Sequence, residues 1–188
     1  MVRAYDGRAV DPPVLERVLD AARRAPSAGN TQALDLVVLS GAEETARYWD
    51  VALPVGPARE GFRWQGLLEA PVLVLPVVAP DAYAARYAEA DKAATGLGSV
   101  EAWPVPYWFV DGGMAVQAML LVTAEEGLGA LFFGLFDRER PVLDALRVPP
   151  DRRGLGVVAL GHPAPDEPGR SAGRPRRPRD DVVHRGGW

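Results

Sequence analysis

The sequence contains no cysteine, and its only two histidines are His162 and His184. The absence of cysteine excludes a disulfide framework, a thiol nucleophile and thiolate metal ligands. Two histidines are too few for a histidine-rich metal site, so we expect no bound metal. Chemistry that depends on a thiol or on a metal ion is therefore disfavoured.

The sequence also lacks an excess of charge of one sign and a long hydrophobic run. Its 21 basic and 25 acidic residues give a formal net charge of -4, which is too balanced to predict a nucleic acid or a membrane surface as a partner. The longest apolar region, residues 107–136, includes Asp111 and Glu125, whereas a bilayer span needs roughly 18 or more residues with few or no charges. No N-terminal signal pattern is present, so we expect a cytoplasmic protein.

Three common catalytic or nucleotide-binding motifs are missing as well. No strand is followed by Gly-x-Gly-x-x-Gly, so a Rossmann fingerprint is excluded. Gly112-Gly113 is not followed by Gly-Lys-Ser/Thr, so there is no P-loop. No Gly-x-Ser-x-Gly occurs, which disfavours an α/β-hydrolase.

The chain has 188 residues and a hydrophobic fraction of 48%, which suits one domain with one core. We therefore expect a single domain over residues 1–188. Residues 163–188 are rich in proline, glycine and arginine and are too polar to bury themselves. This C-terminal extension is expected to wrap over the body, to wrap over a partner subunit, or to be disordered.

Hydrophobic periodicity predicts alternating helices and strands, and hence a layered α+β or α/β domain. Asp11 can cap a first helix that Pro26 stops. The segment 107–126 is predicted to be the longest helix, with Gly127 as its C-terminal cap. It is apolar nearly all round, which places it in the core or in a subunit interface. Pro76 indicates that its strand lies at an edge or is irregular. Further helices are predicted at 42–50, 60–68, 81–87 and 138–146, strands at 34–39, 72–78 and 156–160, a strand or extended turn at 130–135, and a loop or lid at 91–106.

The turn after the first helix offers polar groups that suit a ligand. Ser27, Asn30 and Gln32 supply hydrogen-bond donors and acceptors, and Gly29 lets the backbone approach closely. A flavin has a polar pyrimidine edge and a ribityl chain that need such partners. The same residues are common in ordinary turns, and on the local sequence alone a helix stop is the more frequent reading.

Arginines in the C-terminal extension suit a phosphate. Arg174 and Arg176 are two residues apart and project to the same side of an extended segment, where two guanidinium groups bind a phosphate well. A solvated basic tail is the alternative. Arg3, near the start of the fold, is a third candidate.

Aromatic residues form two further candidates. Phe132, Phe133 and Gly134 can form an apolar wall against a planar ring, or a plain core strand. Other aromatic residues can stack on an aromatic substrate, although such residues more often lie in the core. They are Tyr87, Trp103, Tyr107 and Trp108.

Taken in order, these segments resemble the FMN-dependent nitroreductase family over nearly the whole chain. The most specific part is Arg24-Ala25-Pro26-Ser27-Ala28-Gly29-Asn30-Thr31-Gln32. Weaker matches are residues 2–5, 70–74, 111–129, 160–163 and 174–188. Residues 87–92 and 103–108 are similar to an actinobacterial-type branch.

The resemblance implies an α+β fold, a nitroreductase-like α/β sandwich with a mainly antiparallel sheet, flanking helices, a long central helix and a C-terminal extension. It also implies a homodimer with FMN at the interface. By position, Arg3 lies near the flavin N1 and C2 oxygen, Phe133 and Gly134 lie beside N5, and Arg174 and Arg176 hold the phosphate. The residues that reach the flavin, often from the other subunit, are Pro26, Ser27, Asn30 and Gln32.

The implied activity is ping-pong hydride transfer. NADH or NADPH passes hydride to flavin N5, leaves, and is replaced by a nitroaromatic, quinone-like or related acceptor, so the cofactor rather than a side chain carries the reaction. The substrate pocket is expected to include Phe132 and the four aromatic residues named above. Two alternatives stay open. One is a different reaction on the same fold, such as dehalogenation, azoline oxidation or flavin fragmentation; the other is a non-catalytic flavin-binding dimer.

Two features differ from the family pattern. Family members usually carry an Arg-Arg-Ser-like run whose first arginine binds the FMN phosphate, and Met1 falls at about the third position of that run. Either the natural chain begins earlier, or its start was assigned too late, or the phosphate is bound by Arg174 and Arg176. The aromatic residue that often follows in the flavin-contacting turn is also missing, because Gln32 is followed by Ala33-Leu34.

Overall fold

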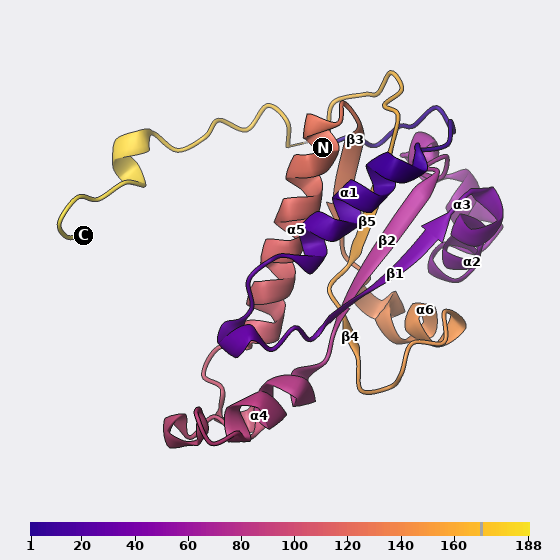
Figure 1. Cartoon of the computed structure of the whole chain (residues 1–188). Coiled ribbons are helices and arrows are strands. Elements are labelled where there is room, and N and C mark those ends of the chain that lie inside the picture. The colour runs from indigo at the N-terminus through magenta and orange to yellow at the C-terminus, as the bar shows by residue number, and fades with distance from the viewer. Residues whose placement is uncertain (170) are drawn as a thin grey trace.

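An antiparallel sheet forms the centre of the fold (Figure 1). The structure is a computed structural model that describes residues 1–169 and 171–188. The strand order is β1-β2-β5-β3, and the two-residue strand β4 pairs with β2 beside β5. All pairings are antiparallel, which confirms the predicted sheet. The strands are β1 (Leu34–Ser40), β2 (Val72–Val78), β3 (Gly129–Phe133), β4 (Arg153–Gly154) and β5 (Val157–Gly161).

Helices cover both faces of the sheet. Because successive side chains of a strand point to opposite faces, Val72 and Val74 of β2 pack with α1 and α5. Leu73 and Leu75 pack on the other side, with α2 and α6. This layering confirms the predicted α+β sandwich. The helices are α1 (Pro12–Arg23), α2 (Ala42–Ala52), α3 (Pro57–Glu60), α4 (Pro80–Ala88), α5 (Tyr107–Glu125) and α6 (Glu139–Ala145).

Pro76 lies in a central strand, so the predicted edge position is wrong and the predicted irregularity is right. On one side of β2, β5 pairs with residues 72–74 and β4 with residues 77–78. Between them the ladder is interrupted, and the N–H of Leu155 donates to the Pro76 carbonyl at 3.0 Å. Because the N–H and C=O of one residue point to the same side of an antiparallel strand, the missing N–H of Pro76 falls in this break.

The long helix α5 ends as its sequence predicts. Gly127 has φ +73°, a left-handed conformation that glycine adopts without steric cost. The N–H of Leu128 donates to the Thr123 carbonyl, and the N–H of Gly127 donates to the Ala124 carbonyl. These two bonds are a Schellman motif that satisfies carbonyls left open at the helix end.

The remaining predicted elements differ in detail. The predicted helix at 60–68 is instead α3 followed by a 3₁₀ turn, Gln65–Leu67. The predicted loop at 91–106 holds two 3₁₀ turns, Ala93–Thr95 and Val100–Ala102. In the parts of the chain that the structure describes, none of the helices combines the length and apolarity that a membrane crossing requires.

The C-terminal extension leaves the body of the fold. Its first part passes the N-terminal segment, where the Ala164 N–H donates to the Ala4 carbonyl at 2.9 Å. The last part runs away from the sheet and carries a short 3₁₀ turn, Arg179–Asp181 (Figure 1). Trp188 and Val182 are exposed there.

Candidate functional site

An aromatic cavity of about 400 Å³ lies between α2, β3 and the N-terminal segment. We call it the Arg3 cavity, because the guanidinium of Arg3 is the one charged group among its lining residues. An apolar cavity with a single cation suits a planar ring that carries negative charge at one edge. The other lining residues are Tyr48, Trp49, Ala52, Leu53, Phe62, Trp64, Leu67, Leu131, Phe132 and Phe133.

Stacked rings make one wall of the Arg3 cavity rigid. Trp49 and Phe133 are almost parallel, with an interplanar angle of 7° and ring centroids 6.0 Å apart. Tyr48 meets the edges of both rings. The structure places Phe133 in an apolar wall of this cavity, together with Tyr48 and Trp49, which the sequence analysis did not include.

Arg3 is held by contacts on two sides. Its Cζ atom lies 5.2 Å from the centroid of the Trp64 ring, a cation–π distance. Its backbone N–H donates to the Asp166 carboxylate at 3.0 Å. The N–H of Val2 donates to the Ala130 carbonyl at 3.0 Å, so the segment also pairs with β3. The position of Arg3 therefore depends on β3, Trp64 and the C-terminal extension.

Tyr5 anchors the same N-terminal segment in the core. Its hydroxyl lies 3.1 Å from the Val2 carbonyl and 3.0 Å from the Ala159 carbonyl. The side chain is buried, and this burial raises the pKa of Tyr5, with a further contribution from the negative charge of Asp166. The phenol therefore stays protonated and donates its hydrogen bond.

Replacing Tyr5 with phenylalanine is expected to lower the free energy of unfolding by about 1 kcal/mol near pH 7, because a buried hydrogen bond is lost. The folded-state pKa of Tyr5 exceeds the unfolded value of about 10. Its contribution is therefore complete below about pH 10 and is lost above it, by up to about 1.4 kcal/mol per pH unit. The difference between wild type and Tyr5→Phe should shrink in urea titrations above about pH 10. A constant difference across this range would contradict the burial argument, and Tyr107→Phe, at an exposed tyrosine, is the control.

A second cavity, of about 650 Å³, adjoins the first at Arg3. Arg176 also lines it, so the structure brings two of the three predicted arginines to one place. Asp166 and Glu167 line it too, which gives it mixed charge. Arg174 is not among its lining residues.

The turn at residues 27–32 lies elsewhere, against α4. Its local structure is fixed by the N–H of Gln32, which donates to Ser27 Oγ at 3.0 Å, and by Gln32 Nε2, which donates to Asn30 Oδ1 at 3.2 Å. Gly29 has φ +62°, and a Cβ there would lie 2.8 Å from the Tyr87 ring. Within one chain the turn does not line the Arg3 cavity. Asn30, Gln32 and Pro26 are exposed and so remain available to another molecule.

A buried carboxylate ties this turn to the body. Asp111 Oδ2 accepts from the Ala28 N–H at 2.7 Å and from the Tyr83 hydroxyl at 2.8 Å. Asp111 is buried. Burial and this carboxylate together raise the pKa of Tyr83. The sequence signal for this anchor is an acid within an apolar segment, which the sequence alone supports as an argument against a membrane span and as part of the family resemblance.

The predicted substrate aromatics form a packed cluster around Tyr83. Trp103 and Trp108 are buried, Tyr87 is half-buried and Tyr107 is exposed. Their ring centroids lie 4.7–6.3 Å apart, mostly edge to face. None of these four residues lines the Arg3 cavity, whereas Phe132 does.

Phe136 is a residue that sequence reasoning missed. It is 86% exposed and has φ +48°, a left-handed conformation that is uncommon for a bulky residue. Its ring covers Gly134, where a Cβ would lie 3.0 Å from the ring. An exposed aromatic residue in an uncommon backbone conformation is a candidate for ligand contact.

Comparison with known proteins gives a consistent result. The profile of the Nitroreductase family matches residues 1–162. A protein of Archaeoglobus fulgidus with the name "Putative NADH dehydrogenase/NAD(P)H nitroreductase" is 26% identical over 190 residues, covering 100% of this chain and 92% of that protein.

Solved structures share the fold. An FMN-dependent nitroreductase from Clostridium difficile R20291 has a TM-score of 0.69 and 16% identity, covering 100% of this chain and 94% of the other. A Desulfovibrio desulfuricans structure in complex with FMN has a TM-score of 0.69 and 23% identity, covering 100% and 91%.

Proposed function

This chain belongs to the nitroreductase family, and from that premise we propose that it is an FMN-dependent oxidoreductase that uses NADH or NADPH to reduce nitroaromatic, quinone-like or related acceptors. The observation that carries the proposal is the Arg3 cavity, in which one cation faces an aromatic wall. The names of the relatives agree, since one is an FMN-dependent nitroreductase and another was solved with FMN.

The residues of the Arg3 cavity fit an isoalloxazine ring. A reduced flavin carries negative charge near N1, and a fixed guanidinium in an apolar surrounding stabilises such charge strongly. Trp49 and Phe133 supply a flat surface, and Gly134 leaves the backbone after β3 without a side chain. Arg176 lines the adjoining cavity together with Asp166 and Glu167, and its guanidinium would hold the phosphate.

When bound, FMN supplies hydride transfer at N5 in a ping-pong sequence. The chain's own residues bind, orient and exclude water. Arg3 offsets negative charge at one edge of the ring, the aromatic wall keeps water from that face, and Phe136 covers Gly134 from the solvent side. No side chain acts as a proton donor or nucleophile in this proposal.

The proposal includes a homodimer, because one chain leaves part of the site open. Ser27, Asn30 and Gln32 do not line the Arg3 cavity of their own chain, and a second copy can bring them there. Helix α5 presents an exposed apolar face that suits this contact. Gly113 lies on that face with open space around it, and glycine in a helix costs about 1 kcal/mol relative to alanine. A glycine at this position allows the backbone of a partner subunit to come close, which explains why this residue is found there despite its cost. The face is Val110, Gly113, Met114, Gln117 and Leu121.

Replacing Leu121, which is 62% exposed, with glutamate is expected to weaken the dimer at least about 100-fold, because an unpaired charge buried in an interface costs several kcal/mol. The mass should be measured by analytical ultracentrifugation over a range of concentrations. Ala145→Glu places the same charge on the exposed end of α6 and should leave the mass unchanged. A Leu121→Glu protein that stays dimeric would remove α5 from the interface.

The function is tested on the purified protein by its absorbance spectrum, by identification of the released cofactor, and by steady-state oxidation of NADH and NADPH with nitro and quinone acceptors. Colourless protein that does not bind added FMN would end the proposal. A holoprotein that reduces no such acceptor would favour dehalogenation, azoline oxidation or flavin fragmentation. Nicotinamide-driven turnover would reject the non-catalytic dimer.

A further inference from the structure

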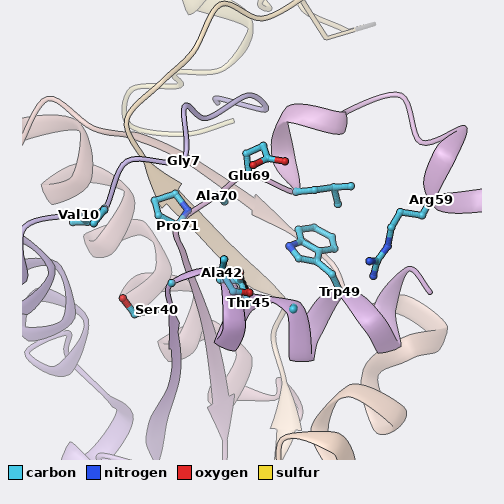
Figure 2. Close-up of a pocket in the computed structure, with 14 residues that line it drawn as sticks. Gly7, Val10, Ser40, Ala42, Thr45, Trp49, Arg59, Glu69, Ala70 and Pro71 are labelled. Carbon is cyan, nitrogen blue, oxygen red and sulfur yellow. Dashed lines mark hydrogen bonds between the residues drawn. The ribbon is translucent and has the colours of Figure 1, made fainter. Parts of the chain in front are cut away.

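A third cavity, of about 410 Å³, lies on the other side of Trp49. We call it the Pro71 cavity; Figure 2 shows its lining residues. Trp49 is the single residue that lines both this cavity and the Arg3 cavity. The two spaces therefore meet at this residue.

Trp49 carries a buried polar atom that lacks a partner. Among the described residues, its indole Nε1 is the one buried side-chain nitrogen or oxygen without a hydrogen bond. The side chain is 6% exposed. Figure 2 shows the nitrogen on the ring edge that faces Ala42, Thr45 and Pro71. Because nearly all buried polar groups in proteins are hydrogen-bonded, an unpaired donor on a residue that lines a cavity calls for an acceptor.

The first turn of α2 adds backbone donors at the same end of the cavity. Ala42, Thr45 and Trp49 recur at helical spacing and share one face of α2. The N-cap residue Gly41 has no side chain to cap the helix, and it lines the cavity with Ala42. In the chain as described, the N–H groups of residues 42–44 make no hydrogen bond to the protein. A helix N-terminus with open N–H groups favours negative charge.

The charges and the apolar lining restrict the ligand. Arg59 is the one cation of the lining, and its guanidinium already bonds the Leu53 carbonyl and Asp50. Glu69 at the rim and Glu43 in the first turn of α2 oppose a multiply charged anion. Most of the lining is apolar and includes Val10, Ala46 and Pro71. The ligand that fits this cavity carries one negative charge, accepts hydrogen bonds, and has a small apolar body.

We propose that the Pro71 cavity binds a small monocarboxylate with an apolar body, which accepts a hydrogen bond from the Trp49 indole N–H and lies against Val10, Ala46 and Pro71. The site differs from the one proposed for FMN, because none of its residues except Trp49 lines the Arg3 cavity. The inference does not rest on the oxidoreductase proposal.

The test uses full-length protein saturated with FMN, labelled with ¹⁵N, and titrated with sodium benzoate as the probe. The indole N–H resonance of Trp49, assigned by its loss in Trp49→Phe, should shift downfield and saturate. Benzamide, which is neutral, and toluene, which has no acceptor, should bind more weakly in that order. Trp49→Phe keeps an aromatic ring but lacks the donor, and should bind benzoate about fivefold to tenfold more weakly, measured by calorimetry.

Two leucine substitutions on α2 separate the cavities. Ala46 lines only the Pro71 cavity, and Ala52 lines only the Arg3 cavity. Ala46→Leu fills the proposed site and should abolish benzoate binding, whereas Ala52→Leu, compared with wild type in the absence of FMN, should leave it unchanged. Ala42→Leu replaces Ala46→Leu if that variant does not fold.

The opposite pattern, with binding lost in Ala52→Leu and kept in Ala46→Leu, would place benzoate in the Arg3 cavity and overturn the inference. The absence of a saturable shift would show that benzoate does not bind at the Trp49 indole N–H, and would overturn the inference as well. If the protein does not bind FMN, it is titrated with benzoate in the same way without FMN. The oxidoreductase proposal and the carboxylate-site proposal can therefore be rejected independently.

Discussion

Replacing Asp111 with alanine is expected to lower the free energy of unfolding by about 3 kcal/mol. The substitution leaves the Ala28 N–H and the buried Tyr83 hydroxyl without an acceptor, and each unsatisfied buried group costs about 1–3 kcal/mol. The alanine variant also no longer buries a carboxylate, and the free energy saved in this way offsets part of that loss of stability. For a domain of this size, the melting temperature should fall by roughly 6–12 °C. Urea denaturation followed by circular dichroism measures the change.

Two neighbouring variants separate the hydrogen bonds from the charge. Asp111→Asn keeps an oxygen that can accept both bonds, so it should lose about 1 kcal/mol or less. Tyr83→Phe removes one donor and keeps the ring, and should lose about 1 kcal/mol. If Asp111→Asn is as unstable as Asp111→Ala, the ionised carboxylate rather than its two bonds holds the turn to α5.

The Asp111 anchor explains why the turn at residues 27–32 could not be placed from its own sequence. Its polar residues resemble those of any helix stop, and the partner that fixes it lies 83 positions away along the chain. The periodicity of α1 and α5 and the Gly127 cap depend on neighbours within a few residues, so these were predicted correctly. Pro76 was placed at an edge because the break between β5 and β4 is created by other strands.

The residues of the Arg3 cavity also divide into those that the local sequence predicts and those that depend on distant parts of the chain. Phe133 is predicted as a wall because it lies in a strand that the hydrophobic pattern identifies. Tyr48, Trp49 and Trp64 were not expected, since they come from a helix and a loop whose relative placement depends on packing. The segment at 60–68 has helical spacing, yet Trp64 has φ -104° and ψ 61° and interrupts the helix. That interruption brings the Trp64 ring to Arg3.

Replacing Arg3 with methionine is expected to have the largest effect on the proposed cofactor. Methionine keeps an unbranched apolar stem of similar reach but removes the charge. A hydrogen bond to a charged group contributes about 1.5–3 kcal/mol, so FMN affinity should fall about tenfold to 100-fold. If the loss is about 1.4 kcal/mol greater for the reduced flavin, the two-electron potential becomes about 30 mV more negative. Fluorescence titration and a dye-coupled redox titration measure these two quantities.

Arg63 provides a matched control for this variant. Its Cζ atom lies 4.5 Å from the centroid of the same Trp64 ring that Arg3 contacts, but Arg63 does not line the cavity. Its ion pair with Glu167, at 3.7 Å, is exposed, and such pairs contribute little. Arg63→Met therefore removes the same charge from the same ring, and should change FMN affinity less than about twofold. Equal effects from both variants would mean that the charge acts through Trp64 or at long range, and that Arg3 does not contact the flavin.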